Sequence, residues 1–173
     1  MGDRLQGKIA LVTGVGGGIG KACALRFAEQ GAIVVGADIN ADMAHQTAAE
    51  ARERGLDMEI FAPCDLTQAA DVRRYVETAG DRHGRIDLLL NAAAIPPHMA
   101  SAAAMDYDDQ WTPARRLAGA TEGEVRDRPL ARIPMRRFGQ PDDIAWCAVY
   151  LASDEASWVT GANFPIDGGV MAV

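Results

Sequence analysis

A glycine-rich stretch near the start of the chain has the residue types and the setting of a phosphate-binding loop. The residues TGVGGGIG (13–20) follow a short apolar run and open an amphipathic segment. A helix that begins there would direct free N–H groups and the positive end of its dipole at an anion such as a pyrophosphate. Gly14, Gly18 and Gly20 would let the backbone turn and the ligand come close. A glycine-rich turn that binds nothing is the competing interpretation.

A carboxylate further along the chain favours the nucleotide interpretation. Asp38 ends the second apolar run, 18 residues after Gly20. A dinucleotide-binding fold expects an acid about 20 residues on, bonded to the ribose 2′-hydroxyl. A carboxylate repels a 2′-phosphate, and no basic residue interrupts the glycine loop to offset this. We therefore expect NAD rather than NADP. The alternative is that Asp38 only caps the helix that follows.

Alternating apolar and amphipathic segments would position these residues. We expect buried strands over residues 8–14, 32–39, 58–66 and 85–95, with helices between them over 16–31, 40–55 and 67–84. Asn40 and Thr67 are the expected N-caps. A further helix over 140–153 and a short last strand in NFPIDGG (163–169) follow. This alternation predicts an α/β fold, in which helices cover both faces of a parallel sheet.

Composition excludes several classes of protein. The chain has 173 residues, of which 49% are apolar and 24% charged, so we expect a single domain over residues 1–173. The net charge of −7 argues against a nucleic-acid partner or an anionic membrane surface. Cys23, Cys64 and Cys147 show no metal or disulfide spacing and are expected to be packing residues. Since we find neither a bilayer-spanning run nor a signal-peptide core, we expect a cytoplasmic protein.

Several motifs together resemble the short-chain dehydrogenase/reductase family. TGVGGGIG matches its Thr-Gly-x-x-x-Gly-x-Gly motif, and CDLT (64–67) resembles the segment whose Asp contacts adenine. NAAA (91–94) resembles its Asn-Ala-Gly segment, with Ala93 where Gly is usual, and residues 136–169 resemble its C-terminal signature. The resemblance implies a Rossmann-like fold, hydride transfer between NAD and a small alcohol or carbonyl substrate, and a homo-oligomer. It assigns the cofactor to Gly14, Gly18, Ile19, Gly20, Asp38, Asp65, Leu66, Asn91 and Ala92.

The proton relay of the resembled family is missing. In that family a Tyr acts as general acid or base, a Lys four residues later lowers its pKa, and a Ser orients the carbonyl. A free phenol has a pKa of about 10, and a nearby cation stabilises its anion. The lysines of this chain stand at positions 8 and 21 alone, and Tyr75, Tyr107 and Tyr150 have no Lys four residues on. We therefore assign no catalytic residue and expect weak turnover or none.

The missing segment would lie between Trp111 and Thr112. Two βα units of the resembled fold, roughly 60 to 80 residues, would be absent there. Residues 1–111 would then form the cofactor half, and residues 112–173 the lid, last helix and last strand. We expect about five strands in the family order 3-2-1-4-7, or an open edge that a second copy covers. The alternatives to an enzyme are a non-catalytic nucleotide-binding or assembly module and an incomplete form of a complete dehydrogenase.

Other polar residues support weaker hypotheses. His98 could serve as a general acid in the loop after the fourth strand, whereas no strand–turn–helix elbow surrounds Ser101. Asp106 is interpreted as a loop residue. No metal site is expected.

Three arginines and an aromatic pair lie in the C-terminal part. Arg132, Arg136 and Arg137 could form an anion patch, and the alternative is that they are solvated or paired with nearby acids. Trp146 and Tyr150, four residues apart on a helix, are expected in the core.

Overall fold

The computed structural model describes residues 2–94 and 130–172. The chain divides into two compact units, which we describe separately. The first unit comprises Met1–Ala94 and Pro141–Ala162, and the second comprises Ile95–Gln140 and Asn163–Val173. A single domain over residues 1–173 stays a prediction, and the boundary at Trp111 falls outside the described residues.

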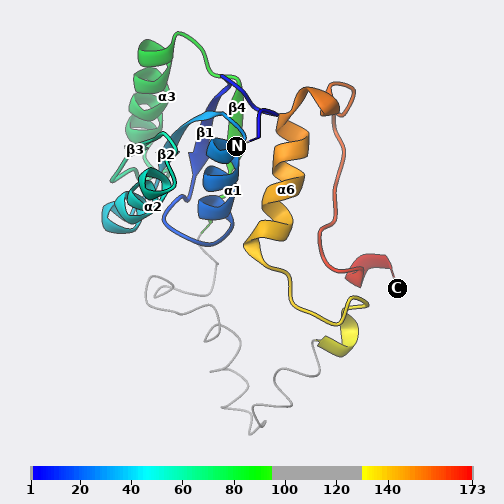
Figure 1. Ribbon diagram of the computed structural model, residues 1–173. Helices are drawn as coiled ribbons and strands as arrows, with labels where there is room; N and C mark the ends of the chain where they lie inside the picture. Colours follow the sequence, from blue (N-terminus) through cyan, green and yellow to red (C-terminus); the bar gives the residue numbers. More distant parts are fainter. Residues whose placement is uncertain (1, 95–129, 173) are drawn as a thin grey trace, which may run out of the picture. The chain divides into compact units, whose positions relative to one another are not determined.

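A four-stranded parallel sheet forms the centre of the first unit (Figure 1). Its strands are β1 (Ile9–Thr13), β2 (Ile33–Ala37), β3 (Met58–Phe61) and β4 (Leu88–Asn91), in the order β3-β2-β1-β4. β1 is buried at every position, as its apolar run predicts for a central strand. All three pairings are parallel, so the four strands end along one side of the sheet, which we call the carboxyl edge.

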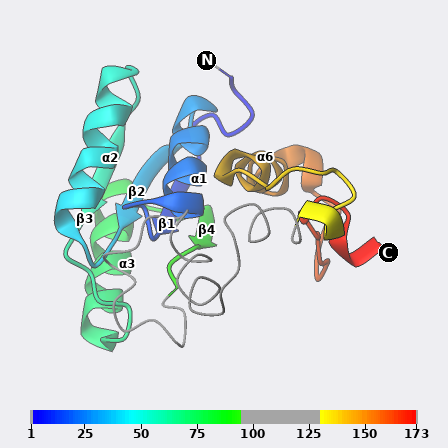
Figure 2. The ribbon, with the colours of Figure 1, turned by 90° about the horizontal axis from the view of Figure 1, so that it is seen from below.

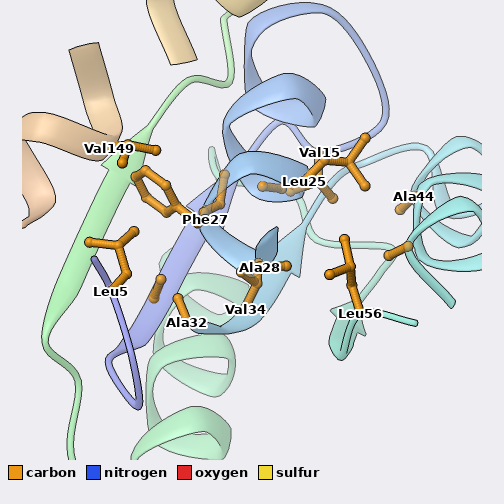
Figure 3. Packing of buried hydrophobic residues seen from close by; sticks show 14 residues of the cluster. Leu5, Val15, Leu25, Phe27, Ala28, Ala32, Val34, Ala44, Leu56 and Val149 are labelled. Carbon is orange, nitrogen blue, oxygen red and sulfur yellow. The ribbon is translucent and has the colours of Figure 1, made fainter. Parts of the chain in front are cut away.

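Helices cover both faces of this sheet. Alternate residues of a strand point to opposite faces, so Val12 and Val34 pack with Phe27 of α1 (Gly18–Glu29). Ala44 of α2 (Ala41–Glu53) belongs to the same cluster, part of which Figure 3 shows. On the other face, Leu11 and Val35 pack with Tyr75 of α3 (Ala69–His83).

A fourth helix, α6 (Pro141–Ala152), packs beside α1 (Figures 1 and 2). Ala145 and Val149 are fully buried on its inner face, and Val149 joins the cluster that contains Phe27 (Figure 3). A single 3-10 turn, η2 (Asp154–Ala156), follows. In the second unit the described residues include another 3-10 turn, η3 (Val170–Ala172).

The predicted Rossmann-like core is confirmed, including the order 3-2-1-4 of its first four strands. The predicted fifth strand over residues 163–169 is wrong, because these described residues form no strand. Gly168 and Gly169 have φ angles of +66° and +91°, which lie outside the extended region of a regular strand. The Asp167 carboxylate closes a turn by accepting from the N–H groups of Gly169 and Met171, both at 2.9 Å.

Two side-chain predictions also need correction. The N-cap of α3 is Gln68 rather than Thr67, because the Thr67 N–H and hydroxyl both donate to Asp65 instead. Trp146 is 43% exposed rather than part of the core, and its ring lies 4.9 Å from the Arg26 guanidinium. The ring thus forms a cation–π contact with a charged side chain and is not enclosed among apolar groups. The predicted Asn40 N-cap of α2 is confirmed, since its side chain accepts from the Met43 N–H.

Candidate functional site

The glycine loop between β1 and α1 contains three glycines with different physical roles. Gly14 and Gly18 have φ angles of +74° and +53°, in the left-handed region that favours glycine. Gly20 has another role, since a Cβ atom there would lie 2.1 Å from the Gly14 carbonyl oxygen. The first turn of α1 can therefore lie directly against the end of β1 only with glycine at position 20.

Asp38 fastens this loop to the end of β2. Its Oδ2 accepts from the Gly16 N–H at 2.8 Å, and its Oδ1 accepts from the Asn40 N–H at 2.8 Å. The backbone of the loop is also tied to β2, because the Gly14 N–H donates to the Ala37 carbonyl at 2.8 Å. Asp38 is not the N-cap of α2, which is Asn40. The half-buried carboxylate lies beside the glycine loop, as a ribose-binding acid would.

Asp65 and Leu66 follow β3 at the same carboxyl edge. The Cys64 N–H donates to the Asp38 backbone carbonyl at 2.8 Å, which places this segment next to the end of β2. The Asp65 carboxylate accepts from the Thr67 N–H at 2.9 Å and from its hydroxyl at 2.7 Å. These bonds lower the pKa of Asp65, so it presents a stable carboxylate at neutral pH.

Asn91 and Ala92 lie at the end of β4, next to β1. Asn91 is the register partner of Thr13, and its side chain is exposed. The Thr13 hydroxyl accepts from the N–H groups of Ala92 and Ala93 at 3.1 and 3.2 Å. The structure thus brings all four predicted segments together at the carboxyl edge, where ligands bind in open α/β sheets.

The surface in front of the loop has room for a ligand. A Cβ atom at Gly18 would meet no atom within 4 Å, so this residue borders open space. Two apolar side chains beside the loops, Ile19 and Leu66, are 39% and 38% exposed. A helix N-terminus, two carboxylates and exposed aliphatic groups fit the pyrophosphate, ribose and adenine parts of a dinucleotide.

Thr47 supports the site from α2 and was missed by the sequence analysis. Its fully buried hydroxyl lies 2.8 Å from the Val15 carbonyl of the glycine loop and 3.2 Å from the Met43 carbonyl. A threonine among the apolar positions of an expected helix was a signal, since its hydroxyl needs a partner when buried. Its partner across 32 residues of chain could not be read from the sequence.

The two lysines are engaged in ion pairs. The Lys21 ammonium lies 2.7 Å from Glu50, and Lys8 donates to Asp154 at 2.6 Å and to the Ala152 carbonyl at 2.9 Å. The Tyr75 hydroxyl is buried and donates to the Val35 carbonyl at 2.6 Å, while burial raises the pKa of this phenol above its usual range. Tyr75 is therefore a core residue with no part in a proton relay.

Several residues considered in the sequence analysis fall outside the described residues. His98, Ser101, Asp106 and Tyr107 belong to the part of the chain that is not described. Within residues 2–94 and 130–172, no group of His, Cys, Asp and Glu side chains could hold a metal ion. No helix among the same residues is long and apolar enough to cross a membrane.

Comparison with known proteins identifies two matching family models that meet at the predicted junction. The family described as "short chain dehydrogenase" matches residues 8–114, and the family described as "Enoyl-(Acyl carrier protein) reductase" matches residues 110–171. Trp111 and Thr112 lie where the two matches overlap. The two blocks that the motifs indicated are therefore both recognised, one on each side of the junction.

Individual relatives match nearly the whole chain. The 2,5-dichloro-2,5-cyclohexadiene-1,4-diol dehydrogenase of Sphingobium indicum is 29% identical, with 98% of each chain covered. A crystal structure of hydroxysteroid dehydrogenase from Escherichia coli has a TM-score of 0.75 at 25% identity, with 96% of this chain and 97% of that chain covered. A 7α-hydroxysteroid dehydrogenase complexed with NADH and 7-oxo glycochenodeoxycholic acid has the same TM-score and identity, over 96% of this chain and 95% of that chain.

The length of one alignment shows how many positions this chain lacks. The alignment with the Sphingobium indicum enzyme runs over 246 positions, 73 more than the 173 residues of this chain, so at least 73 positions have no counterpart here. This agrees with the predicted loss of two βα units. The first family model covers more than half of the chain, and the fold and the relatives agree with it. The chain belongs to the short-chain dehydrogenase family of oxidoreductases.

Proposed function

We propose that this chain binds NAD(H) at the carboxyl edge of its sheet. The observation that carries the proposal is the position of Asp38, which holds the glycine loop at Gly16 beside the N-terminus of α1. Gly14, Gly18, Ile19 and Gly20 would surround the pyrophosphate. Asp38 would bind the ribose, and Asp65 and Leu66 would contact the adenine. Asn91 and Ala92 would contact the cofactor beside the end of β4.

The same geometry favours NAD over NADP. The Asp38 carboxylate would face the ribose 2′ position, where it accepts hydrogen bonds from a hydroxyl and repels a phosphate. The nearest lysine along the loop, Lys21, is already paired with Glu50. A 2′-phosphate would thus meet a carboxylate without a free cation from this lysine to compensate it.

Hydride transfer between NAD and a small alcohol or carbonyl is the family reaction, and we propose that this chain performs it weakly or not at all. Both lysines form ion pairs, and neither stands four residues after a tyrosine. General acid–base help contributes about 10²–10⁴-fold to rate, and loss of cofactor orientation would cost more. The same observation favours a second candidate, a cytoplasmic nucleotide-binding or assembly module that acts as a homo-oligomer. An incomplete form of a complete dehydrogenase is the third.

Titration of NADH fluorescence tests the proposed cofactor site. We expect Asp38→Ala to weaken NADH binding at least tenfold, because the ribose and the Gly16 N–H both lose their acceptor. Asp81→Ala, an exposed acid on α3, is the matched control and should bind as the wild type does. Equal affinity of Asp38→Ala and wild type would refute the assignment.

A charge-neutral variant separates ligand contact from loop support. Asp38→Asn keeps an oxygen that can accept from the loop but removes the negative charge. We expect its preference for NADH over NADPH to fall at least tenfold, since a 2′-phosphate is no longer repelled. If Asp38→Asn weakened the binding of NADH and of NADPH by the same factor, Asp38 would act only by supporting the loop.

Comparison of NADH with ADP-ribose tests whether the nicotinamide half of the site operates. If only the adenosine half is built, ADP-ribose should bind within about threefold of NADH, because the nicotinamide adds little binding free energy. Reduction of a panel of carbonyl compounds, monitored at the NADH absorbance, should show no turnover of ordinary enzyme size, about 1–10³ per second. NADH binding tenfold tighter than ADP-ribose, together with ordinary turnover, would contradict the proposed loss of activity.

A further inference from the structure

The second unit contains two arginines that line one pocket. Arg132 and Arg136 border an open surface pocket of about 600 Å³, and the other lining residues among those that the structure describes are Ala131, Pro134 and Val170. All five residues belong to the second unit, so the pocket is built within one compact part of the chain. Its volume falls in the range of about 300–1,000 Å³ that small-molecule sites occupy.

The charge of this pocket is not neutralised by the described residues around it. The described part of the second unit contains three arginines and one acid, Asp167, in a chain whose net charge is −7. Both Asp167 oxygens accept from backbone N–H groups of their own turn, at 2.9 Å each. Six arginines of the first unit form ion pairs with acids, whereas no ion pair joins Arg132 or Arg136 to a described residue.

The exposed residue Arg136 has an unusual backbone conformation. Its φ angle of +55° lies in the left-handed region, which side-chain-bearing residues rarely adopt. Arg136 ends a turn that contains Pro134, because its N–H donates to the Ile133 carbonyl at 2.8 Å. One guanidinium nitrogen donates to the Ala131 carbonyl at 3.1 Å, and no hydrogen bond joins the other guanidinium N–H groups to a described residue, so they could bind a ligand.

We propose that this pocket binds a small organic anion through a phosphate or carboxylate group. The two guanidinium groups would bind the anionic oxygens, for which their planar N–H donors are suited. Ala131, Pro134 and Val170 would contact a short apolar part of the same molecule. The arginine patch that the sequence suggested thus becomes a defined site at Arg132 and Arg136. Arg137 does not line the pocket and donates to the Phe138 carbonyl.

Titration calorimetry with butyl phosphate and with butyrate tests the site and distinguishes the two anions. We expect the full chain to bind at least one of them, and Arg132→Gln/Arg136→Gln to bind it at least tenfold more weakly. Arg73→Gln, an exposed arginine on α3, is the matched control and should bind as the wild type does. Absence of binding by both probes, or equal binding by the double variant, would overturn the proposal.

A second variant distinguishes loss of the anion site from loss of the fold. Arg136→Gly removes the guanidinium and places glycine at a φ angle that it adopts readily, so the turn should be preserved. We expect this variant to keep its circular dichroism spectrum and to lose anion affinity at least threefold. The site is independent of the proposed cofactor site: Asp38→Ala should retain anion binding, and Arg136→Gly should retain NADH binding. Unchanged anion affinity in folded Arg136→Gly would contradict the role of this residue.

Discussion

At the scale of single residues, short polar side chains determine the shape of the cofactor loop. Thr13 accepts from two N–H groups after β4, Asp38 accepts from Gly16, and Thr47 donates to the carbonyl groups of Val15 and Met43. The bonds to Gly16 and Val15 satisfy backbone groups of the tight glycine turn, and the bonds to Thr13 satisfy N–H groups after β4. The loop is therefore held by side chains from α2 and from the end of β2 as well as by its own glycines.

Removal of the Thr47 hydroxyl should loosen the loop. Thr47→Val keeps the volume but leaves the buried Val15 carbonyl without this donor, which typically costs about 1–3 kcal/mol. We expect urea unfolding to show a free energy of unfolding lower by that amount and NADH binding to weaken severalfold. Thr47→Ser, which keeps the hydroxyl, is the control and should bind NADH nearly as the wild type does. A Val variant with unchanged stability would show that the hydroxyl bond contributes nothing.

At the scale of elements, a chain of ion pairs joins three helices of the first unit. Charges of alternating sign connect α2, α1 and α6 in the order Lys21, Glu50, Arg54, Glu29, Arg26 and Asp142. Arg26 binds Asp142 through two nitrogens, at 2.7 and 2.5 Å. α6 comes from the second of the two family blocks, so this network and the buried Val149 attach it to the cofactor half.

The Arg26–Asp142 pair should make part of the stability pH-dependent. The hydrogen bonds from Arg26 lower the pKa of Asp142 in the folded state. The contribution of this pair to the free energy of unfolding is thus fully present above the unfolded pKa of Asp142, about 3.9. It is lost as the pH falls through the lower pKa of the folded state. Because Asp142 is 44% exposed, we expect Asp142→Asn to lower the free energy of unfolding at pH 7 by only about 0.5 kcal/mol.

The difference between wild type and Asp142→Asn should shrink as unfolding is measured at increasingly acidic pH. Asp57 is an exposed acid without an ion pair among the described residues. As the control, Asp57→Asn should have the same free energy of unfolding as the wild type at each pH. A difference that grows on acidification would contradict the assignment of the pKa shift to this pair.

At the scale of the whole molecule, the sheet of the first unit has an incomplete edge. β4 pairs with β1 on one side, and no strand of the described residues pairs with its other side. Leu89, whose register partner Leu11 is buried on the α3 face, is 60% exposed. An unpaired edge next to an exposed apolar side chain favours association with another chain. This arrangement supports the proposed homo-oligomer.

Light scattering after size-exclusion chromatography measures this association. We expect the wild type to form an oligomer and Leu89→Lys to shift the mass toward the monomer, because a charge at the edge opposes strand pairing. Leu89→Met keeps an apolar side chain and should behave as the wild type does. A wild-type monomer, or a Lys variant with the oligomer intact, would contradict an interface at β4.

Much of the fold was predictable because its determinants are local in the chain. The apolar runs indicated β1 to β4, and the strand–glycine–helix pattern placed Gly14, Gly20 and Asp38 at one edge before any contact was known. The prediction of a fifth strand was wrong because a short apolar run such as NFPIDGG does not determine its own backbone conformation. Asp167 and two glycines with positive φ angles turn it away from a strand.

The family, its cofactor motif and the absence of a Tyr-x-x-x-Lys relay follow from residue types and spacing alone, since each is a pattern within a short stretch. The partners of Thr47, Lys21 and Tyr75 could not be predicted from residue types and spacing, because their contacts join segments that are distant in the chain. The pocket that Arg132 and Arg136 line could not be predicted from the sequence either. The sequence left open whether these arginines were solvated, paired with acids or placed together in an anion patch. Only the folded backbone determines which charges meet.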